Sequence, residues 1–551
     1  MGPSIFANLP FELLERIIRQ QEPARIAVSR EVCKTLKTVV DNSPAMVYTI
    51  TLAKYGLKEN PAALPVSAAE RLGLLNAQVN SSWVEMQPGE DTEELITPSF
   101  RLWEFFGNVF AHVIDNNIIF NQFASPRTNR PRLTWEVPLR MRGALGDFGM
   151  DPSQDLLILA RSDVSPPVLT LAFRTMSTGH GHPMAKLTEL TIPTQAIDAS
   201  LGLSYHISVC GTFACILLND GDDGNGFGLF IIDWKTGELC MDLRRSDGYD
   251  LVSFAFVSET QIAVCAVERE EEEDVVQGIR IYNFLSGQRI VSVADRDCVD
   301  LFLELPGNFR AVYDCTIRSD PTPAWPGPGD TFTQFYDHPD ELIYTIFVRS
   351  LGEHDDVTLV VRRASLLEHL GRGVRDIPWS DWGERGASCV DIIDGDSYWT
   401  CRTFGSLMVA ANIDTEALTI NIDTEALTIY DFNQKRARLF PESLTSRSES
   451  TGKGEGTRLT LVPFDDKGEH VGVLEGKDEG KEKGQDATED EFDWETESEN
   501  ITNDSFDCIA SLPFRKRVFP NILSEGRQDA MIGLDCILII DDEAQFCVLS
   551  L

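Results

Sequence analysis

The sequence has no long hydrophobic run, no paired cysteines and little positive charge, and each absence excludes a class of protein. No apolar stretch reaches the roughly 18 residues of a membrane span, and no charged segment followed by an apolar one opens the chain, so neither a membrane anchor nor a secretory signal is indicated. The 12 cysteines include no C-x-x-C pair, which argues against zinc sites and a disulfide framework. A net charge of −39 excludes nucleic acid and anionic membranes as partners, because both attract basic surfaces. We therefore expect a cytoplasmic or nuclear protein with reduced, buried thiols.

No motif for catalysis or cofactor binding stands out either. Asp220–Gly226 has the spaced acids of a calcium loop, but Gly224 occupies a ligand position and the twelfth position has no Glu. His180 and His182 have no third ligand nearby, so a polar turn is the simpler interpretation. The eight histidines are dispersed, and neither G-x-S-x-G nor H-E-x-x-H occurs. The sequence therefore predicts a protein that is not an enzyme and holds no cofactor or metal.

The first 45 or so residues predict a compact series of short helices. Pro10 suits the first turn of a helix, where its missing N–H has no partner, and Asn8 before it is a suitable cap. Apolar positions recur at helical spacing on either side of Pro23: Leu9, Leu13, Leu14, Ile17 and Ile18 before it, and Ile26, Val32, Leu36 and Val39 after it. So few residues bury too little surface to be stable alone. The unit should complete its core against another protein or the rest of the chain.

This pattern resembles the F-box, the helical module that docks onto the Skp adaptor of cullin-RING ubiquitin ligases. The match covers about residues 6 to 48 and lies in the Leu9-Pro10 start with Glu12, the Ile17-Ile18 pair, the Pro23 turn, the Val32-Cys33 pair and the closing Ser43-Pro44. The resemblance implies adaptor contacts at Leu9, Pro10, Leu13, Leu14, Ile17, Ile18, Ile26, Val32, Cys33 and Leu36. The alternative is an ordinary amphipathic hairpin packed on its own domain.

Beyond about residue 130, the sequence pattern changes to one that predicts short, closely spaced strands. Runs rich in Val, Ile and Phe, separated by Gly, Asp, Asn and Pro, predict strands at Asp155 to Ala160, Val168 to Phe173, Ile207 to Leu218, Leu229 to Ile232, Val252 to Phe256, Ile262 to Val267, Ile279 to Tyr282, Leu342 to Val348, Val357 to Val361, Leu407 to Ala410, Leu427 to Tyr430 and Cys536 to Ile540. Before them, helices are expected at Ala68 to Ala77 and around Phe100 to Phe110. The β region is a sandwich, barrel or propeller.

A recurring element favours the propeller. A strand, an aromatic residue and a turn closing on glycine end at Gly179, Gly237 and Gly287, the last two 50 residues apart. Such a period predicts blades of several strands each, about seven in all. Asp147–Leu157 and Leu229–Glu238 also resemble segments of large fungal F-box proteins with a degenerate WD-like propeller.

Three segments do not fit a regular propeller. Asn412–Ile420 and Asn421–Ile429 are identical copies of NIDTEALTI, and an odd insertion swaps the faces of a strand, so one copy should bulge or loop out. The segment 441–503 is expected to be a disordered insertion, since Asp465–Glu499 holds 15 acids and 4 bases. Glu268–Asp274 reads as a solvated hairpin tip or a patch for a basic substrate segment.

The predicted fold class is mainly β with a small all-α N-terminal module. The expected organisation is an F-box at 1–50, a mixed, partly helical linker at 51–125, a propeller at 126–440, the acidic insertion at 441–503 and final propeller strands at 504–551. The function implied is substrate recognition in an SCF-type ligase, with the Skp adaptor, a cullin through it and an unknown protein target as partners. Gln21 and Leu36 replace the family's usual apolar residue and tryptophan, which favours the alternative of a scaffold with a vestigial F-box. A propeller enzyme would require polar groups clustered at the central channel.

Overall fold

The structure is a computed structural model of the 551-residue chain. It describes residues 9–79, 92–95, 102–125, 130–194, 203–220, 226–269, 274–275, 278–306, 312–327, 330, 333–350, 357–373, 375–390, 401–413, 425–439, 512, 514–520, 527–541 and 546–550. The expected acidic insertion 441–503 and Cys508 lie outside these ranges. Within them, no helix is both long and apolar enough to cross a membrane.

Five helices form the N-terminal part. They are α1 (Phe11–Ile18), α2 (Pro23–Val32), α3 (Lys34–Asp41), α4 (Pro44–Lys54) and α5 (Ala68–Val79). Prolines open α2 and α4, where a missing N–H costs nothing, and the Ser43 hydroxyl caps α4 by accepting from the Met46 N–H. The predicted cap Asn8 lies outside the described residues, and Pro10 occupies the N-cap position of α1.

Five separate sheets have four antiparallel strands each. Their strands, in spatial order, are β3 (Trp103–Phe106), β4 (Val109–Ile114), β5 (Asn117–Gln122) and β6 (Leu133–Pro138); β7 (Asp147–Asp151), β8 (Leu156–Val164), β9 (Pro167–Thr175) and β10 (Glu189–Pro193); β21 (Val312–Arg318), β23 (Ile343–Ser350), β24 (Val357–Arg362) and β26 (Ala387–Val390); β27 (Thr403–Phe404), β28 (Leu407–Ile413), β29 (Glu425–Asp431) and β30 (Arg515–Pro520); and β31 (Arg527–Ile532), β32 (Cys536–Asp541), β33 (Phe546–Ser550) and β2 (Thr92–Leu95). The last sheet joins strands from opposite ends of the sequence.

The remaining large sheet has eleven strands. It contains β11 (Leu203–Cys210), β12 (Phe213–Asp220), β13 (Gly226–Asp233), β14 (Glu238–Arg244), β15 (Tyr249–Phe256), β16 (Gln261–Arg269), β17 (Asp274–Val275), β18 (Gly278–Asn283), β19 (Ile290–Ser292), β20 (Leu301–Glu304) and β25 (Asp376–Ile377). Its two halves meet where Gly226 of β13 pairs with Leu251 of β15 and where β14 runs parallel to β19. A Cβ at residue 226 would lie 2.5 Å from the Leu251 carbonyl oxygen, so this approach requires glycine. Separate four-stranded blades therefore number five, not the expected seven or so.

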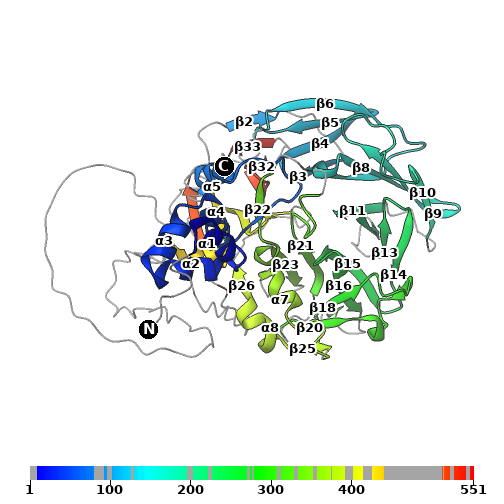
Figure 1. Cartoon of the computed structure of the whole chain (residues 1–551). Helices are drawn as coiled ribbons and strands as arrows, with labels where there is room; N and C mark the ends of the chain where they lie inside the picture. The colour runs from blue at the N-terminus through cyan, green and yellow to red at the C-terminus, as the bar shows by residue number, and fades with distance from the viewer. Residues whose placement is uncertain are drawn as a thin grey trace, which may run out of the picture.

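The sheets follow one another around a ring, as Figure 1 shows. Apolar clusters fill the space between neighbouring sheets around the whole ring. A single sheet cannot bury its own two faces, so each sheet packs its apolar side chains against the next. The ring closes where Phe105 and Phe110 of the first sheet pack against Leu538 and Val548 of the last. The arrangement is that of a propeller.

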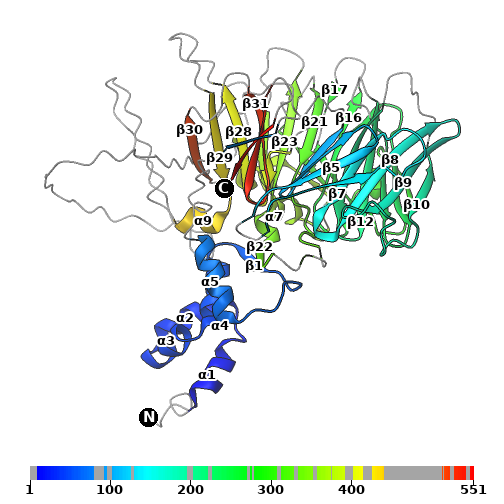
Figure 2. The same ribbon diagram turned by 90° about the horizontal axis from the view of Figure 1, so that it is seen from above.

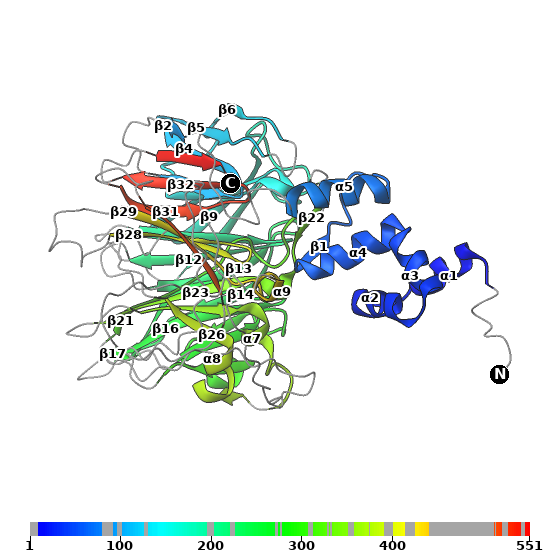
Figure 3. The same ribbon diagram turned by 90° about the vertical axis from the view of Figure 1, so that its left-hand side faces the viewer.

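A small two-stranded sheet and several short helices lie on one face of the ring. A two-stranded sheet pairs β1 (Leu57–Glu59) with β22 (Phe335–Asp337). The short helices are η2 (Pro152–Gln154), η4 (Arg296–Cys298), η5 (Pro339–Glu341), α7 (Arg363–Leu367), α8 (Trp379–Gly386) and α9 (Gln434–Leu439). Figures 2 and 3 show α1 to α5 projecting from this face, with α1 to α3 farthest from the ring.

Most sequence-predicted strands are confirmed, as is the helix at Ala68 to Ala77. Gly179, Gly237 and Gly287 do close turns, with φ of +68°, +76° and +94°. The single strand expected over Ile207 to Leu218 is two strands, separated by a turn at Gly211.

The helix expected around Phe100 to Phe110 is wrong. These residues form β3 and β4, which turn at Gly107 with φ +63°, so strands of the first sheet lie within the expected linker 51–125. In the duplicated segment, Asn412 of β28 pairs with Ala426 of β29, and the residues between the two strands lie outside the described ranges.

The eleven cysteines within the described residues are all free thiols. Seven of them are buried and Cys33 is exposed, so most pack as small apolar side chains.

Candidate functional site

The N-terminal helices enclose a small core of their own. Its buried members are Leu14, Ile18, Ile26, Val39, Val40 and Met46, with Leu9, Leu36 and Ile50 packed against them. Ser43 connects the start of α4 to α1, since its hydroxyl donates to Glu15 at 2.5 Å. The helices therefore share a core of their own, and a hydrogen bond joins α1 to α4.

An apolar surface remains on the outside of these helices. Phe11, Leu13, Ile17, Val28 and Val32 have exposed fractions between 39% and 68%. They are five of the twelve large hydrophobic side chains that are exposed in the described part of the chain, yet they fall within 22 residues. Clustered exposed apolar groups of this kind mark protein interaction sites. We call these five residues the apolar patch.

The ten residues predicted as adaptor contacts divide into two groups. Pro10, Leu13, Ile17, Val32 and Cys33 are exposed and lie on or beside the apolar patch. Leu14, Ile18 and Ile26 are buried in the helical core, with Leu9 and Leu36 partly buried against it. The recurrence of apolar residues every four positions identified the apolar stripe. It did not show which of these side chains face the helical core and which face outward. Phe11 and Val28, which the sequence reasoning did not select, belong to the outward side.

A second feature is the joint between the helices and the ring. After α4, β1 pairs with β22, and the Asn60 side-chain amide donates to the carbonyls of Asp330 (2.9 Å) and Thr333 (2.8 Å). Apolar side chains of α4 and α5 share one cluster with Trp325 and Phe404 of the ring. Strand pairing, hydrogen bonds and apolar packing together make this a rigid connection.

Gly56 lies at the centre of the joint. Its carbonyl accepts from the His338 backbone N–H at 2.8 Å, and the neighbouring Tyr55 carbonyl accepts from the Asn433 side chain at 3.3 Å. Gly56 has φ +67°, and a Cβ on it would lie 2.6 Å from the Asn433 amide nitrogen. Only glycine satisfies both the backbone conformation and the close approach.

A buried ion-pair network underlies the joint. The Arg436 guanidinium, 1% exposed, donates to both Asp431 oxygens at 2.9 Å, to Asp337 at 3.2 Å and to the Ser406 hydroxyl. Burial alone would raise the pKa of Asp431, but the charge and hydrogen bonds of Arg436 hold that pKa below its usual value. Since Asp337 ends β22 and Arg436 lies on α9, the pair connects the strand beside the helices to the sheet of β27 to β30.

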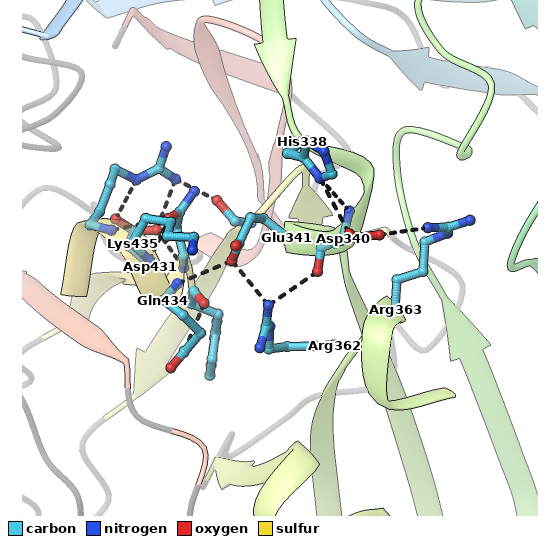
Figure 4. A network of polar contacts seen from close by, with 12 residues as sticks. His338, Asp340, Glu341, Arg362, Arg363, Asp431, Gln434 and Lys435 are labelled. Atoms are coloured by element: carbon cyan, nitrogen blue, oxygen red, sulfur yellow. Dashed lines mark hydrogen bonds and ion pairs between the residues drawn. The ribbon is translucent and has the colours of Figure 1, made fainter. Parts of the chain in front are cut away.

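The network continues into the next sheet, as Figure 4 shows. The buried Glu341 carboxylate of η5 accepts from Arg362 at 3.3 Å and from the Gln434 backbone N–H at 3.2 Å. Arg363 pairs with Asp340 at 3.2 Å and donates to the Val257 carbonyl. These contacts fix η5 between the two sheets that flank the joint.

A third feature is a cavity of about 420 Å³ at the centre of the ring. The first strand of each successive group of strands contributes to its wall: β3, β7, β11, β15, β21 and β31, with Cys401 just before β27. Its charged and polar lining residues are Glu104, Asp147, His206, Ser208, Arg318, Ser319, Asp320 and Cys401, and Trp103, Met150 and Phe254 supply apolar surface. We call it the central cavity.

Three carboxyl groups of the central cavity have strongly perturbed acidities. Burial raises the pKa of Asp147 and of Asp320 to about 7 each. Burial, followed by the charges of those two aspartates, raises the pKa of Glu104 well above its usual value. The three carboxyls line the same cavity, so the charges of the two aspartates act on Glu104.

The cation of the central cavity is already engaged. One guanidinium nitrogen of Arg318 lies 2.9 Å from His206 Nε2. Burial, then the Arg318 charge, lowers the pKa of His206 well below its usual value, so the ring is neutral and accepts from Arg318. Among the described residues, no group of three His, Cys, Asp or Glu is arranged to hold a metal ion.

Sequence reasoning did not find the central cavity. Each acid stands alone in its segment, and only the ring brings the first strands together. The one local signal is an acid within an apolar strand, as at Glu104 between Trp103 and Phe105.

The comparisons with known proteins concern the two parts separately. Residues 6–46 match the F-box domain. No curated protein matches the chain. Solved structures similar to it include the WD40 domain of Toxoplasma gondii coronin (8% identity, 63% of this chain and 73% of that one, TM-score 0.32), BamB of Moraxella catarrhalis (9%, 81% and 82%, TM-score 0.30) and Hsv2p of Kluyveromyces lactis (11%, 47% and 71%, TM-score 0.24). At these TM-scores the structures carry no argument about function. The helices and sheets described above, with the family match, give a chain with an N-terminal F-box domain followed by a mainly β fold of the propeller type.

Proposed function

We propose that this protein is a substrate-recognition subunit of an SCF-type ubiquitin ligase and does not itself catalyse a reaction. The F-box helices would bind the Skp adaptor, and through it a cullin, while the ring holds a protein target. Holding the target beside the ligase makes ubiquitin transfer effectively intramolecular, which raises its rate without any chemistry in this chain. Such a role places the protein in the cytoplasm, the nucleus or both.

The apolar patch is the observation that carries the proposal. The helical core is complete with Leu14, Ile18 and Ile26, so exposed Leu13 and Ile17 serve no purpose within the chain. Both lie on α1, which Figure 3 shows among the helices farthest from the ring. We therefore assign adaptor contact to the exposed group, and assign the buried group the task of holding the helices in place.

The joint supports the same proposal. A ligase subunit must present its target at a defined distance from the adaptor, and a flexible linker would spread that distance over many values. Here β1 pairing and the buried network around Arg436 fix the helices to the ring. A rigid connection is what target presentation requires.

Co-purification with the Skp adaptor tests the proposal. Leu13→Ser with Ile17→Ser should abolish binding, because truncating a central apolar anchor costs about 2 kcal/mol or more of binding free energy. Leu74→Ser is the matched control, since Leu74 is a 49% exposed leucine on α5, outside the F-box match. Undiminished adaptor binding by the double variant would refute the assignment.

A scaffold with a vestigial F-box is the second candidate. Gln21 and Leu36, which depart from the family pattern, favour it. The wild-type protein separates the two candidates, because a vestigial F-box would bring down no adaptor.

A further inference from the structure

We propose that the central cavity receives a lysine or arginine side chain of the protein held by the ring. This inference rests on the proposed function, because it names the chemistry of the target. It concerns a different surface from the apolar patch, so the two can fail independently.

The geometry of the central cavity suits a long cationic side chain. Glu104, Asp147 and Asp320 come from three different sheets or their edges and converge on one space of about 420 Å³. That volume lies in the range of natural ligand pockets and exceeds what a single side chain needs. Trp103 and Phe254 in the wall can lie along an aliphatic stem or face a cation.

The charge balance of the central cavity excludes an anion. Arg318 is the single cation of its lining among the residues that the structure describes, and its guanidinium already contacts the neutral His206 ring. Three carboxyls against one engaged arginine leave an excess of negative charge when ionised. A phosphate or a carboxylate would be repelled, whereas an ammonium or guanidinium would find several acceptors.

The ligand must enter from the side opposite the F-box. On the F-box side, the segment after β21 runs beneath the ring: the Thr322 hydroxyl donates to the Val209 carbonyl at 2.7 Å, and the Gly327 N–H donates to the Ser153 hydroxyl at 2.8 Å. Val209 itself lines the central cavity. The segment then returns to the joint, where Asn60 holds Asp330 and Thr333. The first residues of this segment, Ser319 and Asp320, line the cavity, and the rest of it continues towards the joint.

The raised pKa values of the carboxyl groups predict that binding of a cationic ligand depends on pH. Without a ligand, Asp147 and Asp320, with pKa values of about 7, are only partly ionised at neutral pH. A bound cation favours their charged forms, so binding releases protons and strengthens as the pH rises. Glu104 faces the same space, and its pKa is also raised by burial and by the two aspartates, so a bound cation acts on it in the same direction. Burial keeps His206 and Cys401 neutral in this range, and Arg318 stays charged.

Peptide binding to the full-length protein in complex with the Skp adaptor tests the inference. The probes are the capped tripeptide acetyl-Gly-Lys-Gly-amide, the same peptide with Nε-acetyl-lysine, and spermidine as a free cation, each measured by ligand-observed NMR at millimolar concentration. Glu104→Gln keeps the shape of the side chain and removes a carboxyl group that a bound cation would hold in its charged form. Asp297→Asn is the matched control, because Asp297 is a 99% exposed carboxylate outside the central cavity.

The lysine peptide should bind, the acetyl-lysine peptide should not, and Glu104→Gln should weaken binding about tenfold while Asp297→Asn leaves it unchanged. Adaptor co-purification of Glu104→Gln should match the wild type, which separates this test from that of the F-box. Equal binding of the two peptides, or undiminished lysine-peptide binding by a folded Glu104→Gln variant, would overturn the inference. So would binding of spermidine alone, which would identify a site for free amines.

Discussion

Replacing Arg436 by methionine should destabilise the ring more than any surface substitution. Methionine matches the length of the arginine stem and fills its space, but it removes every hydrogen bond to Asp431, Asp337 and Ser406. Asp431 is 1% exposed and would remain charged without its bidentate partner. The perturbation is therefore electrostatic and leaves packing nearly unchanged.

The expected loss follows from the burial of the pair. Removing one partner of a buried ion pair costs about 3–5 kcal/mol. Here the Asp431 charge would stay buried with only the Arg515 guanidinium, 3.6 Å away, and the Asn433 backbone N–H to compensate it. The entropy of unfolding is about 2.1 cal/mol/K per residue, or roughly 0.8 kcal/mol/K for about 400 cooperative residues. The melting temperature should therefore fall by about 4–6 °C. Arg438→Met, an exposed arginine two residues along the same helix, should leave it within about 1 °C.

The pH dependence of the loss identifies its cause. In the wild type the pKa of Asp431 is depressed, so its stabilising contribution is present above the unfolded value near 3.8 and disappears as the pH falls through the folded value. In Arg436→Met the pKa of Asp431 should rise, because burial then opposes only the Arg515 charge and the Asn433 N–H, and the penalty should shrink as the pH falls from 7 towards 4. Melting curves at pH 7 and pH 5 should therefore show a smaller difference between variant and wild type at pH 5.

Two results would refute this reasoning. One is an Arg436→Met variant that melts like Arg438→Met at pH 7. The other is a deficit that stays constant between pH 7 and pH 5, since loss of packing does not titrate. Arg436→Met with Asp431→Asn provides a further check, because it removes the stranded charge and should recover part of the stability.

Three further predictions concern the F-box, the closure of the ring and the central cavity. Leu14→Ala should empty part of the helical core at a cost of about 2–5 kcal/mol; adaptor binding should be lost while circular dichroism of the sheets persists, and loss of both signals would contradict a separate helical core. Truncation after residue 530 removes β32 and β33, which leaves β2 without its partner, so the melting temperature of the whole ring should fall; an unchanged value would show that the ring does not need closure. Lysine-peptide affinity should rise at least roughly tenfold from pH 6 to pH 8, as Asp147 and Asp320 ionise; an affinity independent of pH would exclude their participation.

Local patterns in the sequence predicted individual strands and turns better than they predicted how the strands assemble into sheets. The glycine turns and the strands around them are confirmed because both depend on a few adjacent residues. Phe105, Phe106 and Phe110 were expected in a helix, since a short aromatic run fits either helix or strand, and only pairing across the turn at Gly107 decides between them. Likewise, the approach of Gly226 to Leu251, which merges strands into the eleven-stranded sheet, has no signature near either residue.

The same holds for the candidate sites: their local parts could be predicted from the sequence, and their assembly could not. The apolar patch and the helical core were visible as one stripe, because helical spacing places both on neighbouring faces. Which side faces outward depends on how α3 and α4 pack, and spacing within α1 does not contain that information. The central cavity depends on residues from separate sheets, so neither Glu104 nor Asp320 has a neighbour in the sequence that reveals the other.

The pairing of β2 with β33 sets the order in which the molecule can be completed during synthesis. Thr92 pairs with Leu549, so the ring cannot close until some 450 further residues have been translated after β2. At about 5–20 residues per second this takes roughly 20 to 90 s. The F-box helices, whose core of six buried side chains lies within residues 14–46, are complete in sequence before that interval begins. On the proposed function, a nascent chain would present its adaptor-binding helices well before its target-binding ring is closed, and a ribosome that stalls late would leave those helices attached to an open sheet.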